Sequence, residues 1–297
     1  MLNQLLLPLQ FDFMLQAFAV AALLSVPMAL LSCYIVLKGW SLMGDAIAHA
    51  VLPGIVVAYL LALPLAVGAF VAGLCCASAT SYIKNNTKLR EDTVMGIVFS
   101  TMFAAGVLLF HSVETDLHLT HLILGDLLGV TRSSLVETAL IALFVLAVLL
   151  LRGRDILLLV FDPQQAHISG ANLSLWRYLF QALLALIIVS ALQSVGMILS
   201  IALLIAPGAC ALLLTKRFSR MLWIAASLAL ASSVFGVYAS FYLDSAPAAT
   251  IVLLLTFVFI LLFIKQGVVR LRVRKRHSAE RVNEMRAEQT PQRASQH

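Results

Sequence analysis

Residues 182–214 read ALLALIIVSALQSVGMILSIALLIAPGACALLL and contain no charged side chain. A membrane-spanning α-helix needs about 20 consecutive apolar residues to cross the roughly 30 Å hydrocarbon layer. Gly196 divides this region: the second run, 197–214, has 18 residues, and the first has 20 when it is counted from residue 176. The stretch therefore predicts two successive membrane helices, with a bend in the second where Pro207-Gly208 interrupts it and a neighbouring helix can satisfy the freed backbone groups.

The rest of the chain repeats this pattern. Of its 297 residues 62% are hydrophobic and 11% are charged, and the mean hydropathy is +1.00, which excludes an ordinary soluble fold. We expect an all-α, polytopic membrane protein with about nine transmembrane helices in one domain, residues 1–264. The apolar runs predict these spans at 14–37, 41–62, 65–83, 93–111, 134–151, 176–195, 197–215, 221–242 and 247–264.

The short polar loops predict the orientation. Threading the spans alternately places the loops around residues 38, 84–90, 152–154 and 216–220 and the C-terminal tail on one side. Of the 20 basic residues only Arg132 falls in a loop on the other side. By the positive-inside rule the N-terminus lies outside and the C-terminus in the cytoplasm.

The two ends of the chain and the cysteines suggest no further domain. Residues 1–12 contain no Lys or Arg, so we expect no cleaved signal peptide. The tail at 265–297 starts with basic residues and is polar beyond them. It predicts a disordered topology signal, with binding to anionic lipid as the alternative. The four cysteines lie in apolar runs without metal-site spacing, and a basic surface for nucleic acid is not indicated.

The segment KGWSLMGDAIAHAVLPGI, residues 38–55, carries the strongest chemical signal. Asp45 and His49 are four residues apart, so on a helix they lie on one face about one turn apart. Carboxylate and imidazole are ligands for divalent first-row metals, and ionisable residues inside a membrane span mark functional sites. A simple ion pair or a helix cap is the alternative reading. Ala46, Ala50 and Gly54 form a stripe of small residues that predicts close helix packing.

The predicted outer loop after the fourth span is the second candidate. Its His111, Glu114, Asp116, His118 and His121 could collect cations or contact a partner protein. The spacing fits no defined metal site, so a solvated loop is the alternative.

The predicted cytoplasmic loop at about 152–175 is the third candidate. Asp162-Pro163 suits the start of a short helix and Gly170 suits its end. A surface connector is the simplest reading of the residues in between.

Four segments, in consistent order, resemble the permeases of bacterial metal-importing ABC transporters of the manganese, zinc and iron family, most closely the enterobacterial chelated-iron/manganese permeases. They are KGWSLMGDAIAHAVLPGI at 38–55, EDTVMGIVFS at 91–100, FDPQQAHISG at 161–170 and QSVGMILSIALLIAPGACALLL at 193–214.

This resemblance implies a type II ABC importer permease fold in the bacterial inner membrane. It implies three partners: a cytoplasmic ABC ATPase dimer, a periplasmic metal-binding protein, and a second copy of the permease or a sister permease. It also implies that Asp45 and His49 handle the transported Fe(II) or Mn(II), or Zn(II). The short helix would be the element that couples to the ATPase through Asp162, Pro163, Gln164, Gln165, Ala166 and Gly170.

The residues themselves exclude several other functions. No GxxxxGK[ST] motif occurs, so ATP hydrolysis must take place on a separate subunit, and the chain is not expected to be an enzyme or to hold a permanent cofactor. An ion channel would carry a selectivity-filter motif or rings of charged residues, and neither is visible in this sequence. A zinc permease of the same family and a self-contained secondary transporter remain the alternatives; the latter typically contains inverted repeats.

Overall fold

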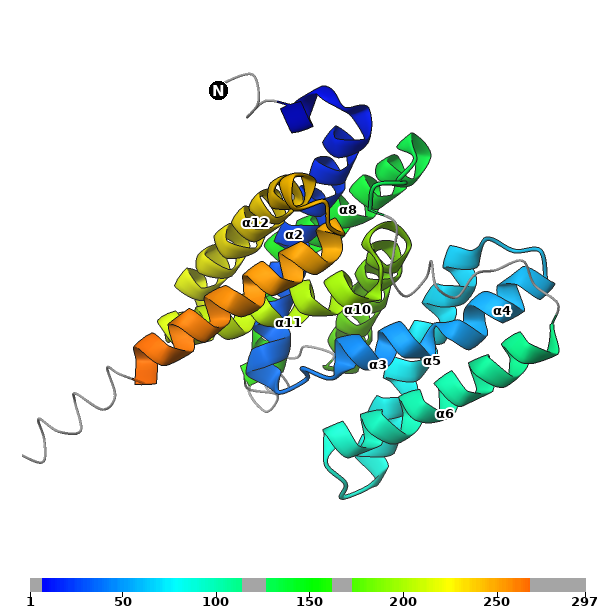
Figure 1. Ribbon diagram of the computed structural model, residues 1–297. Coiled ribbons are helices and arrows are strands. Elements are labelled where there is room, and N and C mark those ends of the chain that lie inside the picture. Colours follow the sequence, from blue (N-terminus) through cyan, green and yellow to red (C-terminus); the bar gives the residue numbers. More distant parts are fainter. Residues whose placement is uncertain (1–6, 114–126, 162–172, 268–297) are drawn as a thin grey trace, which may run out of the picture.

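Helices account for nearly all of residues 7–113, 127–161 and 173–267, which are the parts of the chain that the computed structural model describes (Figure 1). The helices are η1 (Leu7–Gln10), α2 (Asp12–Lys38), α3 (Met43–Ala50), α4 (Leu52–Leu60), α5 (Leu65–Asn86), α6 (Glu91–Ser112), α8 (Arg132–Phe161), α10 (Leu173–Val195), α11 (Met197–Leu214), α12 (Phe218–Leu243) and a last helix, Pro247–Gly267.

Nine stretches within these ranges are helical, long and apolar enough to cross a membrane, and they coincide with the nine predicted spans. Helices α3 and α4 together form one such stretch, interrupted at Val51. The prediction of an all-helical membrane protein is therefore confirmed.

Helix α8 is longer than the sequence predicted. The expected span ended at residue 151 because charged residues follow, but α8 continues to Phe161. Nη1 of Arg152 is 3.4 Å from Oδ2 of Asp155, one turn further along the helix. The guanidinium of Arg152 lies 5.6 Å from the centre of the Trp176 ring. Such pairs support a helix at its solvated end. The loop expected at about 152–175 is therefore shorter, since residues 152–161 belong to α8 and α10 begins at Leu173.

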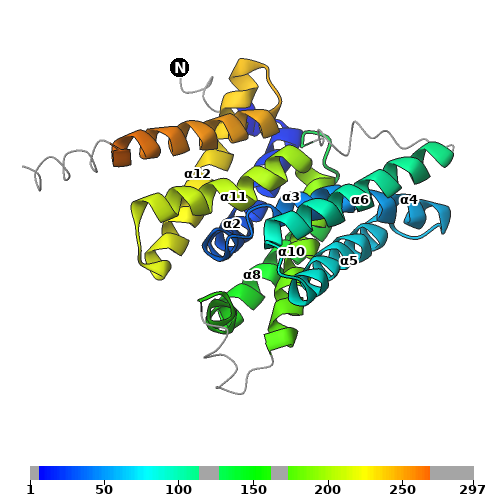
Figure 2. The same ribbon diagram turned by 90° about the horizontal axis from the view of Figure 1, so that it is seen from below.

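Helix α2 lies at the centre of one group of helices. It packs against α8, α11 and α12, and side chains such as Leu24, Met28 and Leu31 are fully buried there. Helices α3, α4, α5 and α6 pack against one another and form a second group. Helix α10 contacts α8, α11 and α2 on one side and α5 and α3 on the other, so it joins the two groups (Figures 1 and 2).

The outward faces of the bundle are apolar. Leu150 and Leu151 of α8 are 72% and 81% exposed, and Leu253 of the last helix is 69% exposed. Large exposed apolar side chains spread over several helices are unusual for a protein in water but suit contact with lipid tails. The fold is thus that of a multi-pass membrane protein.

Two helix boundaries lie at glycines with positive φ, Gly39 and Gly196. Gly39 has φ 77° and follows α2, where its N–H and that of Trp40 bond the carbonyls of Val36 and Ile35. Gly196 has φ 82° and separates α10 from α11, at the position where the sequence predicted the boundary. Non-glycine residues are strained in these conformations, so the two breaks are encoded by residue type.

Candidate metal site

The break at Gly39 positions the first candidate residues. After a turn, α3 begins at Met43, which places Asp45 in its first turn and His49 in its last. A carboxylate in the first turn is stabilised by the partial positive charge of the helix N-terminus. Asp45 is thus the third residue of the span Met43–Leu60, close to the start of the span predicted at 41–62.

Asp45 and His49 contact each other directly. Nδ1 of His49 is 3.2 Å from Oδ1 of Asp45 and 3.0 Å from the backbone carbonyl oxygen of Asp45. Both neighbours are acceptors, so Nδ1 carries the hydrogen and donates it. In the neutral imidazole Nε2 then keeps its lone pair, the arrangement by which proteins orient a histidine toward a metal.

Both side chains remain accessible. The exposed fraction is 32% for the Asp45 side chain and 27% for that of His49. Two aromatic rings of α6 flank the imidazole: the Phe99 ring centre is 5.8 Å away, and the Phe103 ring meets it edge-on at 5.5 Å. The apolar rings strengthen electrostatic interactions at the pair by lowering the local polarity.

His49 also lines a cavity of about 290 Å³ within the bundle. Its wall comes from α3, α4, α5, α6, α10 and α11 and is mostly apolar, with Phe103 and Val107 from α6. Gln193 and Met197, on either side of the break at Gly196, add an amide and a thioether. His49 thus borders a partly open space lined by several helices, and Asp45 is not among the residues that line it.

Close packing of small residues holds α3 and α4 in place, as the sequence predicted. A Cβ built on Gly54 would lie 2.1 Å from the carbonyl oxygen of Gly68, and one on Gly68 would lie 2.2 Å from that of Gly54. Ala50 is fully buried, and the carbonyl of Ala46 accepts a hydrogen bond from the Cys76 thiol. Backbones of α4 and α5 therefore touch where only glycine fits.

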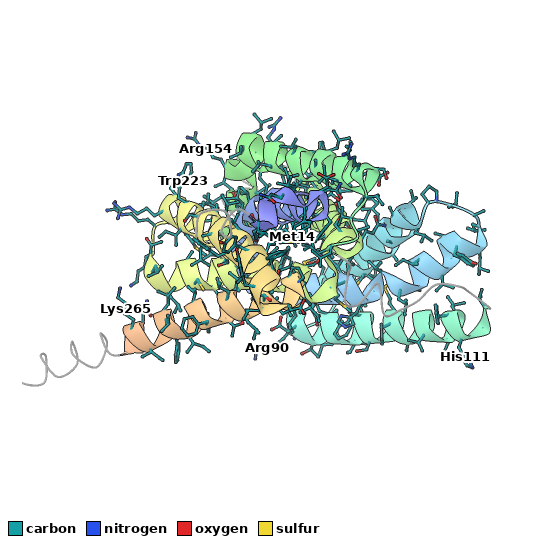
Figure 3. The ribbon with its side chains drawn as sticks, turned by 45° about the horizontal axis from the view of Figure 1, so that its top comes forward. Met14, Arg90, His111, Arg154, Trp223 and Lys265 are labelled. Carbon is teal, nitrogen blue, oxygen red and sulfur yellow. The ribbon has the colours of Figure 1, made fainter. Side chains whose placement is uncertain are left out.

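The predicted outer-loop cluster and the predicted coupling segment lie mostly outside the residues that the structure describes. His111 lies exposed in the last turn of α6, at the end opposite Arg90 (Figure 3). Its partners in the predicted cluster, Glu114, Asp116, His118 and His121, lie outside the described residues. The same holds for Asp162, Pro163, Gln164, Gln165, Ala166 and Gly170. Among the residues that are described, no group of three His, Cys, Asp or Glu side chains could hold a metal ion.

The sequence did not indicate that Phe99 and Phe103 flank His49, or that Val107 lines the same cavity as His49. Their spacing of four residues continues to His111, but each step turns about 40° around the axis, so this line winds around α6 and His111 lies about 120° from Phe99. By helix geometry His111 lies about 12 Å beyond Phe103 along the helix axis. This period in α6 was the available signal, but an apolar stripe in a membrane helix does not reveal which neighbour it faces.

Comparison with known proteins places this architecture among the membrane subunits of ABC transporters. The chain belongs to the ABC 3 transport family, whose model matches residues 10–266. It is 49% identical to the "Probable iron transport system membrane protein" of Haemophilus influenzae over 88% of this chain and 96% of that protein. It is 42% identical to the manganese transport system membrane protein MntB of Synechocystis over 91% and 89%.

A solved structure agrees with this assignment. PsaBC from Streptococcus pneumoniae, determined in complex with Fab, matches with a TM-score of 0.80 and 32% identity. The match covers 92% of this chain and all of the matched chain. The fold predicted from the resemblance, that of an ABC importer permease, is confirmed.

Proposed function

We propose that this chain is the membrane-spanning subunit of an ATP-driven importer for divalent iron or manganese in the bacterial inner membrane. Iron and manganese transport are the functions that its relatives carry in their names. The observation that carries the proposal for this chain is the Asp45–His49 pair, a carboxylate in contact with an oriented imidazole that lines a cavity between the helices. Membrane helices do not require such a pair for packing.

Among the residues that the structure describes, Asp45 and His49 do not make a complete metal site. Asp45 offers one carboxylate oxygen that does not contact His49, and His49 offers Nε2. Mn(II) and Fe(II) favour more ligands than these two groups supply. Because both side chains are partly exposed, the remaining ligands come from water, from backbone carbonyls, or from the second permease copy or sister permease.

Selectivity among metals does not follow from this donor set. His and Asp also bind zinc, which exceeds iron(II) and manganese(II) in intrinsic affinity. Zinc import is therefore the second candidate function, and the metal-binding protein outside the membrane is the proposed origin of the preference. His111, with Glu114, Asp116, His118 and His121, is the proposed entry region, at the far end of α6, the helix whose aromatic rings flank His49.

Energy is proposed to come from a cytoplasmic ATPase dimer. The short segment with Asp162, Pro163, Gln164, Gln165, Ala166 and Gly170 is the proposed contact with it. The charge distribution supports this side as cytoplasmic, with the N-terminus outside and the basic tail at 265–297 inside, next to lipid head groups. Residues 1–264 form the proposed permease domain.

Uptake of radiolabelled Mn, Fe and Zn tests this function, in cells that lack other importers and express the whole transporter. The proposal expects uptake of Mn or Fe that requires both the permease and an intact ATPase. Zinc uptake alone would favour the second candidate. Uptake that persists when the ATPase nucleotide site is inactivated would favour a self-contained secondary transporter, as would failure of the permease to co-purify with an ATPase.

A further inference from the structure

A second, polar cavity of about 170 Å³ lies where α2 and α5 end and where α6 and α10 begin. It is lined by three basic side chains, Lys38, Lys84 and Arg177, each half-buried. They come from three different helices, so the fold brings them together although they are far apart in sequence. This cavity is separate from the one beside His49 and lies at the same end of α6 as Arg90 (Figure 3).

The indole of Trp40 is an independent indication that this cavity binds a ligand. It lines this cavity and is only 4% exposed, yet its indole nitrogen has no hydrogen-bond acceptor in the described part of the chain. An indole N–H can only donate. Buried donors almost always have an acceptor, and leaving one unsatisfied is unfavourable, so an acceptor that belongs to a ligand explains its position.

The charges of the wall favour an anion. Glu91 is the one acidic side chain in the lining, and in the described part of the chain neither Lys84 nor Arg177 forms an ion pair with it. Lys84 has no hydrogen-bond partner there, and Arg177 donates one bond, 3.2 Å long, to the side-chain oxygen of Asn85. An excess of two positive charges would repel a divalent metal, so the cavity does not suit an exit for the transported ion.

We propose that this cavity binds a phosphate group. A phosphate carries negative charge and several acceptor oxygens, which match two or three cationic side chains and one indole N–H. The source is the head group of an acidic phospholipid or a free phosphate. The location supports the lipid, since basic pockets between membrane helices near the surface bind such head groups. The proposed topology determines only which leaflet of the membrane supplies the lipid.

Thermal unfolding of the purified full-length chain in detergent tests the proposal. The ligands to titrate are short-chain phosphatidylglycerol, short-chain phosphatidylcholine and inorganic phosphate. We expect a saturable rise in Tm with phosphatidylglycerol that phosphatidylcholine does not reproduce. If inorganic phosphate gives the same saturable rise, the site takes free phosphate; if it gives none, the lipid is the ligand.

Variants assign the effect to this cavity. Lys84→Ala and Arg177→Ala should each weaken the apparent affinity by about tenfold, because each removes a charge-assisted bond. Lys88→Ala is the matched control: this lysine is exposed and outside the lining, so the affinity should not change.

Trp40→Phe separates binding from folding. The phenyl ring keeps much of the bulk but removes the N–H, so affinity should fall by about fivefold while Tm without ligand is maintained. A permease that shows no saturable response to phosphatidylglycerol or phosphate would overturn the proposal. So would equal affinities of the Lys84→Ala, Arg177→Ala and Lys88→Ala proteins.

Discussion

The hydroxyl of Ser32 in α2 accepts a 2.8 Å hydrogen bond from the backbone N–H of Gly208 in α11 and donates a 3.1 Å bond to the carbonyl of Ile205. These groups lie on either side of Pro207, which cannot donate to the helix. The sequence predicted that a neighbouring helix can satisfy backbone groups here, and Ser32 does so for the N–H of Gly208 and the carbonyl of Ile205. A side chain of the central helix α2 thus stabilises α11 at its proline.

Replacing Ser32 with alanine should therefore destabilise the fold without touching the candidate metal site. Loss of the two bonds should cost about 1 kcal/mol, a typical value for side-chain bonds between membrane helices, and lower Tm by about 3 °C. Thermal unfolding in detergent measures this. Ser227→Ala is the control, because Ser227 bonds only the carbonyl of Ile224 within its own helix. Equal Tm values for the two variants would refute a stabilising role for Ser32.

The contact between Gly54 and Gly68 predicts a larger effect. Gly54→Ala places a methyl group about where the Gly68 carbonyl oxygen lies, so α4 and α5 must separate. We expect a loss of about 2 kcal/mol or more and reduced amounts of folded protein, measured by size-exclusion chromatography. Gly96→Ala is the matched control, because a methyl group there meets nothing within 4 Å. A Gly54→Ala protein as stable as Gly96→Ala would contradict the close approach.

Much of this fold could be predicted from the sequence, because membrane spans can be identified from the length and hydropathy of apolar runs. The span predicted at 41–62 corresponds to Met43–Leu60, and the one at 197–215 to Met197–Leu214. The end of α8 could not be predicted in this way. Hydropathy falls at Arg152, whereas the helix continues to Phe161 and Arg152 contacts Asp155 and the Trp176 ring, a tertiary contact that hydropathy does not report.

The sequence predicted the residue types and spacing of the candidate site but not the cavity around it. The i, i+4 spacing of Asp45 and His49 predicted that they share a helix face, and their atoms are in contact. The cavity beside His49 depends on contacts from α6, α10 and α11, and periodicity within one segment does not reveal such tertiary contacts. For the same reason Lys38, Lys84 and Arg177 had no recognisable pattern in sequence.

Topology can be tested by chemical labelling of two matched positions. Ser112 at the end of α6 and Ser219 at the start of α12 are both exposed, so a cysteine at either one is reachable by reagent. Cys75 is the one exposed native cysteine in the described residues and is first replaced by serine. In intact cells with the outer membrane permeabilised, a membrane-impermeant maleimide should label S112C and not S219C. The opposite pattern would reverse the proposed orientation.

Coupling is tested at Gly170. A glycine just past a short helix commonly adopts a left-handed backbone, which costs a bulky residue about 1 kcal/mol or more. Gly170→Val should therefore redirect the chain and weaken ATPase binding or give hydrolysis without transport, with normal insertion of the permease. ATPase activity and metal uptake are measured on the same reconstituted transporter. Normal transport with coupled hydrolysis would make this segment a plain connector.

The most direct test of the proposed function is ATP-dependent uptake of radiolabelled Mn and Fe by the complete transporter with Asp45→Ala or His49→Ala. Each variant removes one of two donors from a sparse site, so uptake should fall to below about a tenth of the wild-type rate. ATPase association and the amount of inserted permease should be unchanged. Asp92→Ala, which removes an exposed carboxylate in the first turn of α6, should transport normally. Wild-type uptake in both the Asp45→Ala and the His49→Ala transporters would contradict the assignment of the metal pathway to this pair.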